Sequence, residues 1–262
     1  MAPLMHRFHS FVAASAVAIA LCVGTAHAGL IAQGTRVVFP ASEREVTLRV
    51  SNTSGTPVLA QAWIDDGRQD VPPEELQVPF SVTPAVTRVD PNGGAVLRIA
   101  YLKAPLPTDR ESLFWLNILE VPPRDEDENN ALQFSFRSRF KLFFRPSQLK
   151  SVDSAAGKLQ WKFLESGGAG KKTVVQVNNP TPYYVSFASV ELIVDGRVMS
   201  VGKGMVAPFS TKEFDWHGNP KNLEAASVRY EVINDYGGRN TLDRALGKYP
   251  LRFPAFYLRP DI

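Results

Sequence analysis

Apolar and polar residues alternate most regularly between Leu132 and Arg145, in the stretch "LQFSFRSRFKLFFR". The apolar positions are Leu132, Phe134, Phe136, Phe140, Leu142 and Phe144, and the polar ones are Gln133, Ser135, Arg137, Arg139, Lys141 and Arg145, while Phe143 and Ser138 break the alternation. A period of two is typical of a β-strand, whose side chains point to alternate faces. At about 3.3 Å per residue these 14 residues span roughly 46 Å, whereas strands usually have about 3–10 residues. The spare length of this strand therefore needs a partner outside an ordinary small domain.

The rest of the chain also has the texture of a β protein. Short runs rich in Val, Ile, Leu and aromatic residues, bounded by Gly, Pro, Asn or Asp, predict strands at 35–40, 45–52, 58–65, 95–102, 112–121, 158–165, 172–179, 183–194, 227–235 and 249–258. No segment has a sustained 3.6-residue apolar stripe. The polar stretch "PSQLKSVDSAAG" interrupts the pattern and places a domain boundary near 146–151. We therefore expect an all-β chain of two sandwich domains, at 29–148 and 149–262.

The first 28 residues have the layout of a secretory signal peptide. Arg7 supplies the charge, the 14-residue apolar run "FVAASAVAIALCVG" follows, and Ala26-His27-Ala28 offers a small-residue cleavage site. That run is short for a membrane span, which needs about 20 residues, so an uncleaved anchor is the minor alternative. Removal of 1–28 would leave no cysteine, because Cys22 is the only one. An exported chain without disulfides must be held together by its hydrophobic cores.

The overall charge gives no reason to expect a nucleic-acid partner. Without the leader and its single arginine, 29 − 1 = 28 basic residues face 26 acidic ones, a net charge of +2. Arg137 and Arg139 are interpreted as a solvated strand face. Lys141 differs, because apolar residues flank it next to the domain boundary, where it could stand at the mouth of an interdomain cleft.

No set of residues supports catalysis, a metal or a cofactor. The stretch "GGAGKKT" at 167–173 resembles a phosphate-binding loop but has Glu165 where that loop needs Gly and Lys172 where it needs Ser or Thr, so a hairpin turn is favoured. His217 is the only histidine after the leader, and no Gly-x-Ser-x-Gly elbow accompanies it. One histidine and no cysteine leave only carboxylates to bind a metal. We therefore expect a protein that is not an enzyme.

Several segments, in order, are similar to the periplasmic chaperones of pilus assembly, the PapD-like family of the chaperone–usher pathway. They are "TRVVFP", "LAQAWID", "FSVTPAVTRVDP", "DRESLFWLNILEVPPR", "FKLFFRP", "NPTPYYVSF" and "INDYGGR". The resemblance implies two immunoglobulin-like β-sandwich domains in an L-shaped arrangement with an interdomain cleft. It also implies that the long strand is lent to a pilus subunit that lacks its own last strand, so that backbone bonds give affinity and alternate side chains fill a groove.

The resemblance also implies roles for single residues. Arg36 and Lys141 match the two basic cleft residues that hold the carboxylate at a subunit's C-terminus. The subunit's groove would receive Leu132, Phe134 and Phe136. A charged cluster that fixes the angle between the domains would comprise Glu111, Arg145 and Asp235. The chain departs from the family's pattern in having Ala85 after Pro84 and no cysteine pair in the second domain.

The expected partners are therefore pilus or fimbrial subunits and an outer-membrane usher, in the periplasm, with no nucleic acid and no stable membrane insertion. A dimer in which free copies cap each other's long strand stays open. The rival interpretation is an exported two-domain immunoglobulin-like binding module for a carbohydrate or cell-surface partner. The long strand favours the chaperone, because a plain sandwich has no use for three apolar residues exposed on one strand face, and such a face promotes aggregation.

Overall fold

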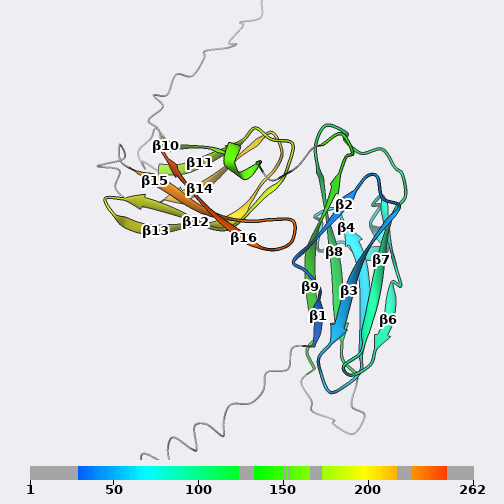
Figure 1. Ribbon diagram of the computed structural model, residues 1–262. Coiled ribbons are helices and arrows are strands. Elements are labelled where there is room, and N and C mark those ends of the chain that lie inside the picture. Colours follow the sequence, from blue (N-terminus) through cyan, green and yellow to red (C-terminus); the bar gives the residue numbers. More distant parts are fainter. Residues whose placement is uncertain are drawn as a thin grey trace, which may run out of the picture.

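Two β-sandwiches make up the chain and meet in an L (Figure 1). The computed structural model describes residues 29–123, 133–149, 152, 154–165, 173–216 and 226–246. Strands of the first sandwich run crosswise to those of the second, and the two halves touch near one end of the first (Figure 1). The expected all-β fold of two immunoglobulin-like domains is confirmed.

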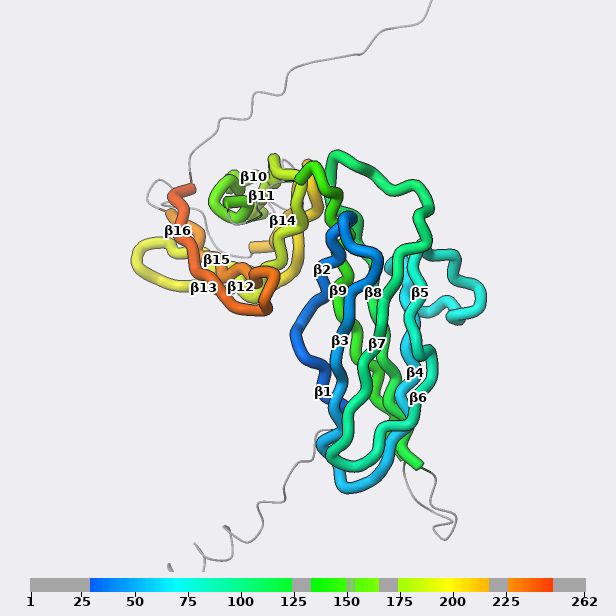
Figure 2. The backbone as a smooth tube through the Cα atoms, turned by 45° about the vertical axis from the view of Figure 1, so that its right-hand side comes forward, coloured from blue at the N-terminus to red at the C-terminus, as the bar shows by residue number. Residues whose placement is uncertain are grey.

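The first sandwich packs a four-stranded sheet against a five-stranded one. The four-stranded sheet has the order β1 (Leu30–Ala32), β3 (Glu45–Asn52), β7 (Gly94–Tyr101) and β5 (Phe80–Thr83). The five-stranded sheet has the order β2 (Arg36–Pro40), β9 (Phe136–Arg145), β8 (Ser112–Val121), β4 (Val58–Asp65) and β6 (Val86–Val89). Both β2 and β9 lie on the side of this sandwich that faces the second one (Figure 2).

The described residues of the second sandwich form seven strands in two sheets. One sheet has the order β10 (Gln160–Glu165), β11 (Thr173–Asn179) and β14 (Ser210–Trp216), and the other has the order β13 (Arg197–Val206), β12 (Val185–Val194), β15 (Ser227–Ile233) and β16 (Arg239–Ala245). Two 3-10 turns, η1 (Pro73–Glu75) and η2 (Ala156–Lys158), complete the described elements.

Each sandwich has its own apolar core. In the first, Phe39, Leu97, Ile99, Leu116 and Leu142 are almost completely buried between the sheets. The second core is built around Trp161, Val190, Leu192 and Tyr230, and Trp161 lies 5.0 Å from the ring of Tyr230. Separate cores make each half a folding unit, whereas the boundary at 148/149 stays a prediction.

Strands that the sequence pattern does not predict are mostly short, polar or interrupted. β16 reads "RNTLDRA" and lies at a sheet edge, where one row of backbone groups and most side chains face water. β13 contains Gly202 and Gly204 and pairs with β12 through register shifts near these glycines. The strand predicted at 249–258 lies outside the described residues.

Candidate functional site

The parallel pairing of β2 with β9 brings together two cations that are far apart in the sequence. Arg36 is opposite Lys141, and the pairing continues to Pro40 opposite Arg145. The next residues, Val37 and Leu142, are buried in the core, so Arg36 and Lys141 point to the outer face of the sheet. We call these two residues the anchor pair. The pattern of β9 and the pairing with β2 therefore place two positive charges side by side at the junction of the two sandwiches.

Both members of the anchor pair contact the second sandwich. Lys141 Nζ donates a 2.9 Å hydrogen bond to Ser186 Oγ on β12. Arg36 Nη1 donates a 2.8 Å hydrogen bond to the carbonyl oxygen of Ile233 at the end of β15. Arg36 Nε is buried and has no acceptor among the described residues. A buried donor without an acceptor favours an anion at this place.

Burial also changes how the anchor pair titrates. Desolvation, followed by the positive charge of Arg36, lowers the pKa of Lys141 from 10.5 to about 8. Desolvation likewise lowers the pKa of Arg36, while the carboxylates of Asp235 and Glu111 oppose this shift. Two half-buried cations held next to each other are the arrangement that a bound carboxylate would relieve, because it can accept charge-assisted hydrogen bonds from both.

A cluster of three charges, which we call the junction cluster, links the two sandwiches at the end of β9. Arg145 Nε donates to Glu111 Oε1 at 2.8 Å, and Arg145 Nη1 donates to Asp235 Oδ2 at 2.7 Å. Glu111 Oε2 accepts a 2.8 Å hydrogen bond from the backbone N–H of Tyr184, and the Glu111 N–H donates to the Pro182 carbonyl oxygen. The structure thus brings Glu111, Arg145 and Asp235 together across the domain junction.

The charges in the junction cluster are strongly shielded from water. Glu111 is 3% exposed. Burial raises its pKa, because desolvation outweighs the attraction of Arg145. Burial opposes the charge of Arg145, yet its hydrogen bond with Asp235 and the charge of Glu111 raise its pKa above the ordinary value. Each charge therefore depends on its partners, and a change in the angle between the sandwiches would separate them.

One edge of β9 is only half occupied. β8 pairs with β9 from Phe136 to Phe144, whereas β2 pairs with it only from Lys141 to Arg145. The stretch 136–140 thus has no strand on its second side within the described part of the chain. The side chains of Phe134 and Phe136 are 60% and 65% exposed, and their rings lie 6.5 Å apart. This exposed edge with two aromatic side chains adjoins the anchor pair.

The long strand is shorter than the sequence pattern predicts. β9 begins at Phe136, not at Leu132, and residues 133–135 are described but have no strand pairing. The pairing of β9 with β8 ends at Phe136 opposite Glu120, and β8 itself ends one residue later, at Val121. Leu132 lies outside the described residues.

The interpretation of Arg137 and Arg139 as a solvated strand face holds only in part, because Arg137 is exposed but both side chains also bind buried polar groups. Arg139 Nη2 donates to both carboxylate oxygens of Asp65, at 2.7 and 2.9 Å, and Arg137 Nε donates to Asn117 Oδ1 at 2.9 Å. Asp65 and Asn117 are fully buried. The sequence alone could not reveal these partners, because Asp65 lies on a strand more than 70 positions away. Ser186 was missed for the same reason.

The remaining candidate chemistry gains no support. His217 and most of 167–173 lie outside the described residues. Among the residues that are described, no group of three or more His, Cys, Asp or Glu side chains could hold a metal, and no helix is long and apolar enough to cross a membrane.

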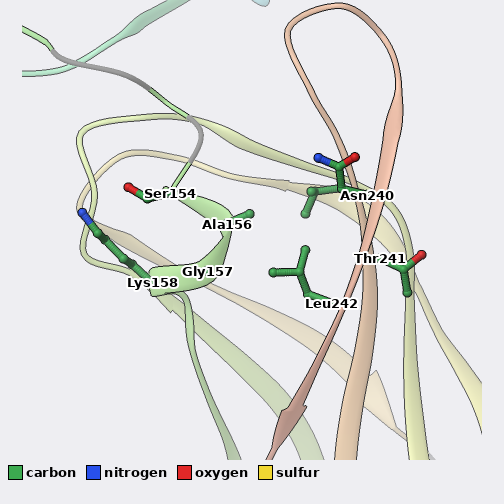
Figure 3. Close-up of a pocket in the computed structure, with 8 residues that line it drawn as sticks. Ser154, Ala156, Gly157, Lys158, Asn240, Thr241 and Leu242 are labelled. Carbon is green, nitrogen blue, oxygen red and sulfur yellow. The ribbon is translucent and has the colours of Figure 1, made fainter.

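A hollow of about 410 Å³ lies between η2 and β16, where Leu242 faces Ala156 and Lys158 stands at the rim (Figure 3). It is formed by the second sandwich alone and includes none of the predicted site residues.

Comparison with known proteins identifies the family. Residues 29–150 match the family "Pili and flagellar-assembly chaperone, PapD N-terminal domain" and residues 154–244 match "Pili assembly chaperone PapD, C-terminal domain". The chain therefore belongs to the PapD-like family of pilus-assembly chaperones, which is not a class of enzymes.

Individual relatives match this chain along almost their whole length. The CupB2 chaperone of Pseudomonas aeruginosa is 88% identical, with a TM-score of 0.72 over 83% of this chain and 100% of that one. The chaperone FimB/FhaD of Bordetella pertussis is 42% identical over 233 residues, which cover 86% of this chain and 91% of that protein. A structure of the Salmonella enterica SafA pilin in complex with the SafB chaperone matches with 31% identity and a TM-score of 0.68, covering 85% of this chain and 99% of the matched chain.

Proposed function

We propose that this chaperone captures fimbrial subunits in the periplasm by lending them β9, and that it delivers them to an outer-membrane usher. The observation that supports the proposal best is the half-occupied edge of β9 at 136–140, next to the anchor pair. A subunit strand that paired along this edge would gain backbone hydrogen bonds, while Phe134 and Phe136 would enter its groove. The family and the pilin complex of the relative SafB support the choice of partner.

Within this proposal, Arg36 and Lys141 hold the carboxylate at the subunit's C-terminus. The buried Nε of Arg36 without an acceptor, and the ammonium of Lys141 directly after the free edge at 136–140, supply donors at one end of the groove. Anchoring the chain end fixes where the subunit strand starts on β9. A slip of one residue would turn its side chains to the wrong face.

The exposed edge also supports a state without a client. Because an unpaired strand edge with aromatic side chains promotes association, two free copies would cover each other's β9. The expected result is a concentration-dependent dimer in size-exclusion chromatography, which a bound subunit dissolves.

Export rests on the leader-like residues 1–28. The N–H of Leu30 donates a 2.8 Å hydrogen bond to Glu120 Oε2, and a Cβ built on Gly29 would clash with the Glu120 carboxylate. An α-ammonium freed at Gly29 by cleavage would therefore lie next to a carboxylate. Mass spectrometry of the periplasmic protein should find a terminus at or within a few residues of Gly29, and an intact Met1 in that fraction would contradict the proposal.

The test of the function is co-purification of a fimbrial subunit with the chaperone from periplasm. The variants Arg36→Ala and Lys141→Ala should lose the subunit and stay folded in a thermal melt, while Phe134→Asp should lose it with the anchor pair intact. Arg88→Ala is the matched control, because Arg88 is an exposed cation of the same sandwich whose ion pair is with the exposed Asp90. Undiminished capture by the folded Arg36→Ala/Lys141→Ala double variant would contradict the anchor.

A further inference from the structure

The outer face of β9 carries three cations in a row, and only one of them belongs to the anchor pair. Arg137, Arg139 and Lys141 follow each other at a spacing of two residues on the same face. Two residues correspond to about 6.6 Å along a strand. A carboxylate docked at Arg139 instead of Lys141 would shift the subunit strand by two residues, and such a shift keeps every side chain on its proper face. Alternation of apolar residues cannot reject this misalignment.

Asp65 pairs with both of the other two cations, and its single negative charge offsets one of their two positive charges. Its Oδ1 and Oδ2 accept from Arg139 Nη2 at 2.7 and 2.9 Å, and Arg137 Nη2 lies 3.6 Å from Oδ2. Asn117, on the strand between them, donates to Asp65 Oδ2 at 2.7 Å and accepts from Arg137 Nε. Gly67 N–H donates to Oδ1 at 2.7 Å. A carboxylate that is 0% exposed thus faces both arginines and is held in place from several sides.

Two tryptophans pack against Arg137 and Arg139 and connect them to the anchor pair. The guanidinium of Arg137 lies 4.9 Å from the ring centre of Trp63, and that of Arg139 lies 4.6 Å from the ring centre of Trp115. Lys141 Nζ lies 6.0 Å from the same Trp115 ring. In the sheet, Trp115 pairs with Asp65 on one side and with Lys141 on the other. Trp115 therefore lies between the arginines bound by Asp65 and Lys141 of the anchor pair.

We infer that Asp65 is a positioning and register-determining residue for subunit capture. It binds the outward arginines of β9 across β8, so that the half-paired stretch 136–140 is held in place and Lys141 is the one cation of this row of three that is not paired with Asp65. The inference rests on the proposed function, because it assumes that a carboxylate docks at the anchor pair. Asp65 is fully buried and therefore acts on a subunit only through Arg137 and Arg139.

The register arm of the test uses Asp65→Asn, which keeps the shape of the side chain and removes its charge. Arg139 is partly exposed and can turn to water, so the variant is expected to fold. The matched control is Asp66→Asn, because Asp66 is the adjacent residue and its ion pair with Arg68 is local and exposed. A photo-crosslinking p-benzoylphenylalanine at Phe136 reports which residue of the co-purified fimbrial subunit lies opposite.

The wild type and Asp66→Asn should each give a single cross-linked subunit position. Asp65→Asn should give a second product two residues away, and the double variant Asp65→Asn/Arg139→Gln should remove that product, because the freed cation two residues from Lys141 is gone. Should Asp65→Asn not fold, Asp65→Glu, which displaces the carboxylate by one methylene, should give a smaller share of the shifted product. An unshifted cross-link in a folded Asp65 variant overturns the inference.

The second arm needs no subunit. Hydrogen exchange of the backbone amides at 136–140 should be at least about tenfold faster in Asp65→Asn than in the wild type and unchanged in Asp66→Asn, because opening of the stretch is no longer opposed. Unchanged exchange would overturn the positioning role. Faster exchange with an unshifted cross-link would show that Asp65 only stabilises the sheet. If the wild type recovers no subunit at all, the proposed function fails, and exchange alone then decides whether Asp65 positions β9.

Discussion

Raising the pH should affect the stability of the free chaperone and its capture of subunits in opposite directions, through Lys141. Burial, and then the charge of Arg36, lower the pKa of this amine to about 8 in the folded chain, from 10.5. Between these two values the unfolded chain holds a proton that the folded chain has released, so the free energy of unfolding rises with pH. Capture needs the ammonium form, because the subunit's carboxylate pairs with it, and should therefore weaken as the pH rises above about 8.

The size of both effects follows from the pKa. The difference between 10.5 and about 8 corresponds to about 3 kcal/mol at about 1.4 kcal/mol per pKa unit. Lys141 is only half-buried and water screens its charge, so we expect about 1–2 kcal/mol of added stability. For capture, the charged fraction of Lys141 falls about tenfold per pH unit above its pKa, and affinity should fall by up to that factor. Tyr184 does not interfere, because burial raises its pKa above 10.

The assay measures subunit binding and the thermal melt of the free chaperone at pH values from 7 to 9.5. Lys141→Arg is the control, because its guanidinium stays charged throughout this range. The wild type should lose affinity above about pH 8. Its melting temperature should rise over the same range once the pH-dependent change seen in Lys141→Arg has been subtracted. If Lys141→Arg lost affinity in parallel with the wild type, the titrating group would lie elsewhere and the reasoning would be wrong.

Three further changes test the junction and the free edge. Arg145→Gln should lower the free energy of unfolding by about 3 kcal/mol, because Glu111 is left buried without its partner, and should split the calorimetric melt into two transitions; a single unshifted transition would contradict this. Gly237→Ala should loosen the same junction, since Gly237 has φ +84° and an added Cβ would come 2.8 Å from Thr35 Oγ1; hydrogen exchange at the junction that matches the wild type would refute it. Phe136→Ser should reduce capture at least about tenfold and leave the melt unchanged, because the ring is 65% exposed; a lower melting temperature would show that the ring belongs to the core.

Alternation along β9 was enough to predict its strand character and its inner and outer faces. Phe140, Leu142 and Phe144 do point into the first core, and Phe134 and Phe136 are exposed, as the excess length implied. The pairing of Arg36 with Lys141 could not be read from the pattern. It depends on a parallel register between strands that lie 105 positions apart, and only the resemblance to a family brought the two residues together.

The sequence could not predict side-chain contacts whose hydrogen-bond acceptor lies on a distant strand. Arg137 and Arg139 look like solvated residues, since nothing near them in the chain is acidic except the loop before β9, and their acceptor Asp65 reaches them across β8. Edge strands such as β16 are missed for a different reason. A strand that faces water on one edge needs few apolar residues, and its alternation is correspondingly weak.

A single turn of the second sandwich connects the anchor pair with the junction cluster. The carbonyl of Ile233 accepts from Arg36, and two residues later Asp235 accepts from Arg145. The carboxylate of Asp235 also raises the pKa of Arg36 against the effect of burial, so the two sites share charge as well as backbone. A carboxylate bound at the free Nε of Arg36 would hold the same guanidinium whose Nη1 donates to the Ile233 carbonyl, and would therefore act on this turn. Subunit binding and the angle between the sandwiches must then influence each other, because any shift of the turn that frees Arg36 also moves Asp235 relative to Arg145.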